Sequence, residues 1–532
     1  MASAENLDVV IVGAGISGMY MLYRMRKLGL STRVIEMGAD LGGTWYWNRY
    51  PGARCDTDTI EYSYSFDEDL QQEWEWPERY PTQPEILTYL NHVADRHDLR
   101  PDIMFSTRVE AAVFDEASNR WRVTTAGGAA FSARFLIMAT GCISEPNIPE
   151  IAGMETFEGP IHHTARFPHE GVDFSGLRAG VIGTGSSGVQ AIPVIAEQAT
   201  HLTVFQRSPQ WSVPAHNRPT DPDLVAEIKA DYAGFRARNR LESGAQLSHI
   251  PANDVSALEV GEAERQRILE ERWQLGGFPF FGAFNDIVIN PESNKATADF
   301  VRAKIRAIVK DPAVAEMLTP DYTIHCKRPV LDSGYFETYN RSNVRLVDIN
   351  AAPIQAITPR GIRTAENEYA LDIIVLATGF DAMTGALLKI DIRGRDGLKL
   401  RDKWADGPVN YLGLQVTGFP NLFTITGPGS PSVLTNMMVA IEQHVEWVTD
   451  CISYMVEREH ACIEASAEAQ AAWVAHVNEV ASGTLWVSCH NWYQGYNIPG
   501  KPRVFMPLPN FPPYVEKCEA VVANGYEGFV LS

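Results

Sequence analysis

The stretch Asp8–Gly18, DVVIVGAGISG, decides the fold. Its apolar run ends at glycines spaced Gly-x-Gly-x-x-Gly, and a helical pattern continues from Ser17 to Leu28. Ser31–Glu36 (STRVIE) is then typical of a second strand. A strand, a glycine turn, a helix and another strand form the repeating unit of a doubly wound parallel sheet. The sequence therefore predicts an α/β fold.

The glycine spacing is typical of a dinucleotide site. Gly13 makes the tight turn, Gly15 lets backbone N–H groups reach a pyrophosphate, and Gly18 packs the helix on the strand. Glu36 ends the next strand, where a carboxylate accepts hydrogen bonds from a ribose 2′-hydroxyl. A purely structural glycine turn is the alternative, but it would not require Glu36 at this spacing.

The same unit recurs in Arg178–Arg207, where the turn is Gly183-x-Gly185-x-x-Gly188. Here the second strand ends at Arg207 and Ser208, without an acid. A carboxylate would repel a 2′-phosphate, whereas an arginine and a hydroxyl would bind it. The first unit therefore suits FAD and the second suits NADPH, unless Arg207 is only a solvated surface residue.

Two further segments resemble each other in sequence, and each ends near a predicted domain limit. Arg134–Gly141 (RFLIMATG) and Asp372–Gly379 (DIIVLATG) are buried-type strands that stop at small residues, where a cofactor or neighbouring backbone could approach. A helix is expected over Met437–Glu457, and an ordered loop after Trp486. We expect two Rossmann-like dinucleotide-binding domains with a helical insertion in the NADP domain: 1–145 and 385–532 for FAD, 146–218 and 326–384 for NADP, and 219–325 for the insertion.

Composition excludes several classes of protein. The 532 residues carry a net charge of −21, which disfavours nucleic-acid binding. No apolar stretch approaches the ~20 residues that span a bilayer, and residues 1–8 lack a signal-peptide layout. We expect a cytoplasmic protein with no membrane contact and no metal, and a monomer by default.

The seven cysteines are scattered singly, without CxxC. This pattern predicts a reducing compartment with no disulfide framework and no zinc ribbon. It also argues against the dithiol chemistry of a thioredoxin-reductase-like flavoprotein.

Two motifs narrow the choice among enzymes that pair FAD with NADPH. Gly42–Asp56 (GGTWYWNRYPGARCD) is dense in aromatic residues and glycines, and Phe157–Pro168 (FEGPIHHTARFP) precedes the second nucleotide unit. The simpler interpretations are a packed loop and a plain linker. A lone histidine in a linker, such as His163, is more often structural than catalytic.

On these residues the chain resembles the Baeyer–Villiger monooxygenases, and the resemblance covers nearly its whole length. The family pattern Gly-Gly-x-Trp-x-x-x-x-(Phe/Tyr)-Pro-Gly-x-x-x-Asp is met completely in Gly42–Asp56. GPGSPSVLTNM (427–437) and the ending NGYEGFVLS resemble the phenylacetone monooxygenase branch. The linker pattern Phe-x-Gly-x-x-x-His-x-x-x-Trp-Pro departs at one position, where this chain has Phe instead of Trp: its matching positions are Phe157, Gly159, His163, Phe167 and Pro168.

The resemblance implies roles that composition alone would not give. Lys327-Arg328 is by itself a basic pair, and most such pairs are solvated. By resemblance, Arg328 is the active-site arginine near the flavin C4a atom and Asp56 orients it. Lys327 would join Arg207 at the 2′-phosphate, and Trp492 would close over NADP on a mobile loop.

The remaining candidate residues fall into three groups, of which the resemblance implies the first two and side-chain character suggests the third. Flavin contacts are Ser17, Thr44, Trp45, Tyr46, Trp47, Tyr62, Val109 and Met437. NADP contacts are Arg54, Thr184, Gly185, Ser186, Ser187, Gly188 and Gln190. The small, uncharged candidates for a substrate pocket are Ser430, Pro431, Ser432, Val433 and Leu434.

The implied activity is the oxygenation of a small apolar ketone to an ester or lactone, with NADPH and O2, through a C4a-peroxyflavin. Sulfides are expected side substrates. The nearest rival is a flavin monooxygenase that oxidises nitrogen or sulfur, and Asp56 and Arg328 disfavour it because that reaction needs no carbonyl activation. A reductase with a protein partner and a non-enzymatic NADPH sensor are further rivals, whereas the absence of GxSxG disfavours a hydrolase.

Overall fold

A computed structural model describes residues 4–532, and it confirms the first predicted unit. β1 (Glu5–Val12) leads through the glycine turn into α1 (Ile16–Lys27), and β2 (Thr32–Ile35) follows. β1 pairs in parallel with β2 and with β6 (Ala130–Met138). Val9, Val10 and Ile11 are fully buried, as expected of a central strand covered on both faces.

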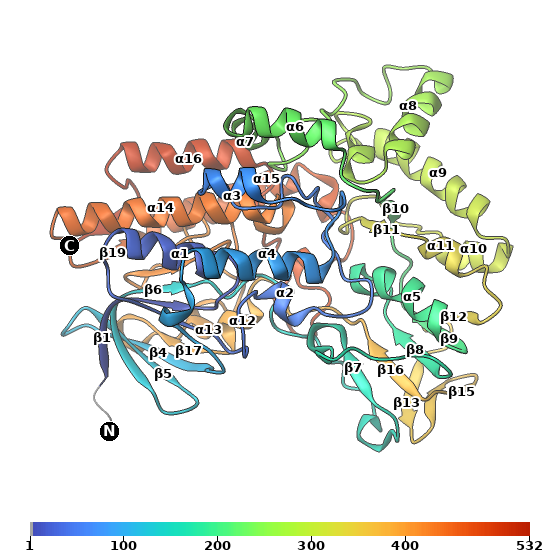
Figure 1. Cartoon of the computed structure of the whole chain (residues 1–532), viewed down its shortest axis with the longest axis horizontal. Helices are drawn as coiled ribbons and strands as arrows, with labels where there is room; N and C mark the ends of the chain where they lie inside the picture. The colour runs from blue at the N-terminus through green and yellow to red at the C-terminus, as the bar shows by residue number, and fades with distance from the viewer. Residues whose placement is uncertain (1–3) are drawn as a thin grey trace.

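The first sheet has eight strands in the order β17-β4-β5-β6-β1-β2-β3, with β18 paired to β6. It lies at the left of Figure 1, below the long helix α14 (Met437–Glu457), which packs against α1. α14 spans the residues predicted for it. The other strands of this sheet are β3 (Ile103–Met104), β4 (Val109–Asp115), β5 (Arg120–Thr125), β17 (Asp391–Arg393) and β18 (Leu422–Thr424).

The second sheet confirms the second predicted unit and lies at the lower right of Figure 1. Its five strands run in the order β12-β9-β8-β16-β7, and each neighbouring pair is parallel. α5 (Ser186–Gln198) connects β8 to β9 after the second glycine turn. The strands are β7 (Ile161–His163), β8 (Arg178–Ile182), β9 (His201–Gln206), β12 (Val344–Asp348) and β16 (Ile373–Leu376).

All of the named elements within residues 219–325 are helices, as expected, and α8 and α9 form the upper right of Figure 1. Three of the helices start at the same local signal, an Asp or Asn whose side chain caps the backbone, followed by proline. The capping residues are Asp221, Asn290 and Asp311. The helices are α6 (Pro222–Ala230), α7 (Tyr232–Leu241), α8 (Glu262–Leu275), α9 (Pro291–Ile308) and α10 (Pro312–Leu318).

Shorter elements complete the chain. The assignment of the predicted domain ranges to FAD and NADP stays a prediction. Residues 1–3 belong to the first range and to the N-terminal segment for which no signal peptide is expected, and they lie outside the described residues. The helices are α2 (Thr44–Trp47), α3 (Glu68–Glu73), α4 (Gln83–Arg96), α11 (Tyr335–Thr338), α12 (Gly385–Leu388), α13 (Leu400–Lys403), α15 (Ala467–Ser482) and α16 (Phe511–Ala523). The strands are β10 (Ser212–Pro214), β11 (Val330–Asp332), β13 (Ile354–Thr358), β14 (Gly361–Thr364), β15 (Glu368–Ala370), β19 (Ile463–Ala465) and β20 (Phe529–Leu531).

The third glycine of each turn is required by close backbone packing. A Cβ on Gly18 would lie 1.8 Å from the carbonyl oxygen of Gly13, and one on Gly188 would lie 2.3 Å from that of Gly183. The second glycine of the second turn differs, because a Cβ on Gly185 would have no protein atom within 4 Å. Gly188 therefore holds helix on strand, whereas Gly185 faces open space.

The prediction of no disulfides is wrong for one pair of cysteines. Cys326 and Cys489 form a disulfide, with Cα atoms 5.9 Å apart, although 163 residues separate them in the sequence. Only the folding of the C-terminal loop onto the segment before β11 brings them within bonding range, so spacing in the sequence gave no signal. The other five cysteines of the described residues are free and buried.

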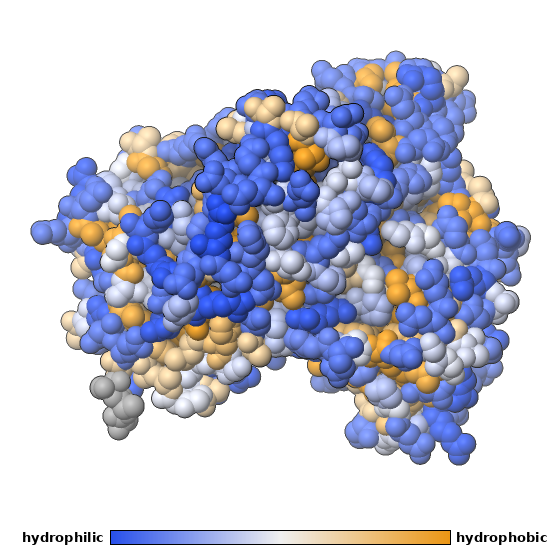
Figure 2. All heavy atoms as spheres, viewed as in Figure 1, coloured by the Kyte–Doolittle hydropathy of each residue, from blue (hydrophilic) through white to orange (hydrophobic). Residues whose placement is uncertain are grey.

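Hydrophilic residues cover most of the face seen in Figure 2, and the hydrophobic groups on it are small and scattered. No helix within residues 4–532 is long and apolar enough to cross a membrane.

The two glycines of the second turn give a matched test of this packing. We expect Gly188→Ala to lower thermal stability, because overpacking of this kind costs about 1–3 kcal/mol. Gly185→Ala should leave the melting temperature unchanged and weaken only nucleotide binding. Differential scanning fluorimetry measures both, and equal melting temperatures for the two variants would contradict this account of Gly188.

Candidate active site

One cavity of 1620 Å³ connects the two glycine turns. Gly13 lines one part of it and Gly183 another. The ends of β6 and β16 also line it, through Ala139–Gly141 and Ala377–Gly379. At these two strand ends the small residues predict that a cofactor or neighbouring backbone can come close. The carbonyl oxygen of Ala139 indeed lies 2.5 Å from the position a Cβ would take on Gly13. The cavity is large enough for ligands to lie against both sheets at once.

At the first turn, the Glu36 carboxylate is buried and fixed by the backbone. It accepts hydrogen bonds from Ala14 N (2.7 Å) and Gly38 N (2.6 Å). Burial raises the pKa of Glu36, and these N–H groups partly offset that effect. An oriented carboxylate thus stands at the end of β2, where a ribose hydroxyl would need an acceptor.

Most of the predicted flavin contacts line this cavity. Trp45 Nε1 donates to the Tyr62 hydroxyl at 3.1 Å, which fixes both rings against the wall. Gly18 and Tyr46 do not line it: Gly18 packs against Gly13, and the Tyr46 hydroxyl accepts from Ala39 N. The residues that line it are Gly13, Gly15, Ser17, Glu36, Thr44, Trp45, Trp47, Asp56, Tyr62, Val109 and Met437.

At the second turn, two cations stand close together. Lys327 Nζ lies 4.2 Å from the centre of the Tyr322 ring, and burial together with the nearby Arg207 lowers its pKa. Gly188 does not line the cavity, since it packs against Gly183. The predicted NADP contacts that do line it are Arg54, Thr184, Gly185, Ser186, Ser187, Gln190, Arg207, Ser208, Lys327 and Trp492.

Between the two turns, Arg328 and Asp56 form an ion pair across 272 residues of sequence. Arg328 donates from Nε (3.0 Å) and Nη2 (2.8 Å) to Asp56 Oδ2, and from Nη1 to the carbonyl oxygen of Val433 (2.8 Å). Burial would lower the pKa of Arg328, but Asp56 more than offsets this and holds it above its ordinary value. The guanidinium is thus a permanent, oriented cation in the cavity wall.

Of the five residues predicted for the substrate pocket, the cavity lining includes Val433 alone. Ser430 and Ser432 are fully buried, and their hydroxyls point to Gly427 O and Met383 Sδ. Pro431 and Leu434 also lie outside the lining. Residues 430–434 therefore pack mostly behind the cavity wall, and only Val433 is part of it.

The linker motif contains β7, the edge strand of the second sheet, and none of its five fingerprint positions lines the cavity. His163 Nδ1 accepts from Ala165 N (3.0 Å), and Nε2 lies 3.2 Å from the Thr378 hydroxyl. Burial lowers the pKa of His163 to about 4, so the ring is neutral at ordinary pH. Phe167 is buried, with Pro168 next to it, and a Cβ on Gly159 would lie 2.1 Å from Asp372 O while approaching the ring of Phe157. These contacts suit an ordering role for the linker.

Sequence reasoning missed several lining residues. Arg166 stacks its guanidinium 4.3 Å from the centre of the Trp47 ring, and Cys142 and Asn491 also line the cavity. Arg166 lies inside the linker motif and Cys142 directly follows a noted strand end, so position could have suggested them. Asn491 carried no such signal.

Comparison with known proteins agrees with this geometry. The sequence model for the pyridine nucleotide-disulphide oxidoreductase family matches residues 10–271. A Baeyer-Villiger monooxygenase from Pseudooceanicola batsensis is 43% identical, over 99% of this chain and 96% of its own. The phenazine N-monooxygenase PhzNO1 from Lysobacter antibioticus is also 43% identical, over 99% and 97%. A solved structure of an oxidised steroid monooxygenase bound to NADP is 53% identical, with a TM-score of 0.94 and 99% of both chains covered.

The fold, the paired glycine turns and these relatives define a two-dinucleotide flavoprotein oxygenase. The chain belongs to the type I Baeyer–Villiger monooxygenases, which use FAD and NADPH to convert ketones into esters or lactones. The predicted family, fold class, activity and cofactors are thereby confirmed. The roles of individual residues and the narrower branch stay predictions.

The two cations at the second turn give a test of cofactor choice. We expect Arg207→Gln to raise KM for NADPH about 10- to 150-fold, because hydrogen bonds to charged groups contribute about 1.5–3 kcal/mol. KM for NADH should change little, since NADH has no 2′-phosphate. Arg178→Gln is the matched control, because Arg178 is exposed and paired with Asp372. Equal losses with both nucleotides would contradict the assignment of Arg207.

Proposed function

We propose that this enzyme acts on small, apolar ketones and that Arg328, held by Asp56, stabilises the negative charge that develops during oxygen insertion. The observation that carries the proposal is the ion pair itself, placed in the wall of a cavity that both glycine turns share. FAD, when bound and reduced by NADPH, supplies the activation of O2. The chain's own residues supply position and charge.

The residues fit both cofactors. Glu36 offers an oriented carboxylate at the first turn, and Arg207 and Lys327 offer positive charge at the second. Gly185 leaves open space where a pyrophosphate would approach the start of α5. We accordingly propose that 1–145 with 385–532 bind FAD and that 146–218 with 326–384 bind NADP.

Arg328 suits the proposed role because its charge does not depend on physiological pH. Its Nε and Nη2 atoms bond to Asp56 and its Nη1 atom bonds to the Val433 carbonyl, so the guanidinium plane has one orientation. A preorganised donor of this kind typically contributes about 2.7–4 kcal/mol to transition-state stabilisation. Because the Arg328 guanidinium is fixed, its charge can stabilise the negative oxygen that forms on the ketone's carbonyl carbon.

The wall near Arg328 favours a neutral substrate. Val433, whose carbonyl oxygen bonds to Arg328, packs in one apolar cluster with Ala382 and Met437, and all three line the cavity. Such a surface binds hydrocarbon, and the Arg328 guanidinium beside it offers a donor to the carbonyl oxygen. We propose apolar ketones as main substrates, sulfides as side substrates, and a monomer as the working form.

Oxygenation of nitrogen is the second candidate, because a relative at 43% identity is named for phenazine N-oxygenation. That reaction needs no stabilised oxyanion, so Arg328 would be dispensable for it. The two candidates therefore differ in their dependence on one residue.

Variants of Arg328 test its role. Arg328→Ala should lower kcat for a ketone about 100- to 1000-fold. Arg328→Lys should remain impaired, because an ammonium keeps the charge but cannot bond to Asp56 and Val433 in the same plane. Steady-state kinetics at saturating NADPH measure both. A ketone turnover that survives Arg328→Ala would remove Arg328 from the mechanism.

The substrate class is tested by NADPH consumption of the FAD-loaded enzyme with and without phenylacetone, coupled to mass detection of the product. Ketone-stimulated turnover that yields the ester supports the proposal. Oxygenated amines or sulfides, with only H2O2 formed from every ketone, would favour the second candidate.

A further inference from the structure

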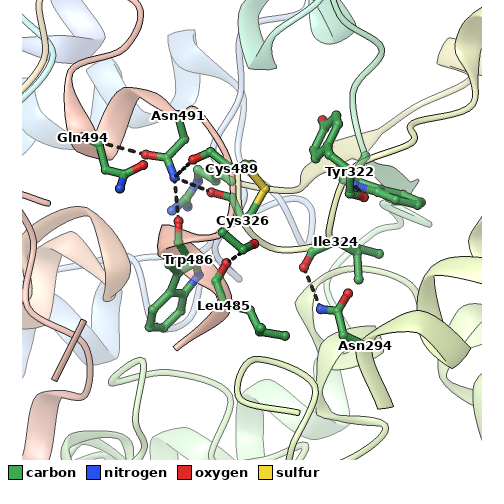
Figure 3. The surroundings of a disulfide bond; sticks show 12 residues. Asn294, Tyr322, Ile324, Cys326, Leu485, Trp486, Cys489, Asn491 and Gln494 are labelled. Carbon is green, nitrogen blue, oxygen red and sulfur yellow. Dashed lines mark hydrogen bonds between the residues drawn. A yellow bond between two sulfur atoms is a disulfide. The ribbon is translucent and has the colours of Figure 1, made fainter. Parts of the chain in front are cut away.

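A covalent bond joins the active-site arginine's own segment to the C-terminal loop. Cys326, two residues before Arg328, is bonded to Cys489 (Figure 3). Cys489 precedes Asn491 and Trp492, which line the cavity, as do Tyr496 and Asn497. We call residues 489–497 the cover loop. The disulfide therefore connects the cover loop directly to the segment that places Arg328.

Asn491 ties the same two segments together without a covalent bond. Its side-chain Nδ2 donates to the carbonyl oxygens of Cys326 (2.8 Å) and Trp486 (2.7 Å), and its Oδ1 accepts from Gln494 N (3.0 Å). Asn491 is 3% exposed, and its bond to Cys326 is buried, whereas the other two bonds are partly buried. Figure 3 shows the amide lying beside the disulfide, between the cover loop and Cys326.

The partner segment of the cover loop is itself anchored to the helical insertion. Asn294 on α9 donates to Ile324 O (2.8 Å), and the buried ring of His325 packs edge-on against Phe281 at 4.2 Å. The end of the insertion at Ile324 and His325, which leads directly into Cys326 and Arg328, is thus packed against the rest of the insertion. The far end of the cover loop has its own contact, from Asn497 Nδ2 to Phe380 O (2.7 Å), so we expect opening of the disulfide to loosen chiefly the part near Cys489.

We propose that the Cys326–Cys489 disulfide and Asn491 position the cover loop over the nucleotide, so that a dithiol reductant loosens the loop and weakens NADP binding. The proposal rests on the proposed function in one respect, that the nucleotide binds in this cavity. In the reaction, the dithiol loses two hydrogen atoms and becomes a disulfide. The S–S bond breaks, and Cys326 and Cys489 each gain one hydrogen on sulfur.

Among the described residues, the Cys326–Cys489 bond is the cysteine site that a reductant in solution can reach. Cys489 is partly exposed between the exposed residues Ser488 and His490, whereas Cys326 is buried. A thiolate can therefore attack at Cys489. The five free cysteines are buried, and burial raises the pKa of Cys142 to about 11 and that of Cys518 to about 12, which keeps them unreactive.

The test uses the full-length, FAD-loaded protein in oxidised and dithiothreitol-reduced forms. Peptide mass spectrometry without reductant should find Cys326 linked to Cys489. Hydrogen exchange of 484–503 should quicken about tenfold on reduction, and the dissociation constant of NADP+, measured by calorimetry, should rise about tenfold. KM for NADPH should rise while kcat at saturation stays within about twofold.

Variants separate the bond from general effects of the reductant. Cys489→Ala without reductant should reproduce the reduced state and should not respond further to dithiothreitol. Cys451→Ala is the matched control, because Cys451 is a buried free cysteine on α14 away from the cavity lining, and it should keep the full response. Asn491→Ala should add to the effect of reduction.

Two results would overturn the proposal. One is the absence of the linked peptide from protein handled in air. The other is identical loop exchange and NADP+ affinity in the oxidised and reduced forms, which needs no variant to fold. Both readouts are independent of ketone turnover, so a failure to oxygenate ketones would count against the proposed function and leave the disulfide's role standing.

Discussion

The ion pair between Arg328 and Asp56 is the interaction on which the site depends. It joins the loop after α2 to the segment before β11, and Val433 O accepts from Nη1, so three distant parts of the chain meet at one guanidinium. Both side chains are 26% exposed, so solvent screens part of the charge that would be left uncompensated if one partner were removed. The pair therefore fixes the geometry of the cavity wall as well as its charge.

The two glycine turns explain why the cavity can hold two nucleotides. Each turn brings a helix start to the end of a central parallel strand, where small residues allow close approach. Glu36 and the pair Arg207 with Lys327 then give the two ends opposite charge. We propose that this difference selects between FAD and NADPH, because a 2′-phosphate would be repelled at one end and attracted at the other.

Features set by neighbouring residues were predictable from the sequence. The β1–α1–β2 unit, its repeat and α14 at 437–457 all follow from local periodicity and glycine spacing. The pairing of Arg328 with Asp56 came from a family resemblance, since nothing local connects residues so far apart. The Cys326–Cys489 bond escaped prediction for the same reason. At 430–434 a run of small residues predicted a pocket, but the tight turn there directs Ser430 and Ser432 into the core.

The account as a whole is tested most directly by oxygen labelling. The FAD-loaded enzyme would turn over phenylacetone with NADPH under 18O2, and the product would be analysed by mass spectrometry. We expect an ester that carries a single 18O atom in its new C–O linkage, with one NADPH consumed per ester. Unchanged ketone with labelled H2O2 as the only oxygen product would contradict the claim that this cavity inserts oxygen beside a carbonyl.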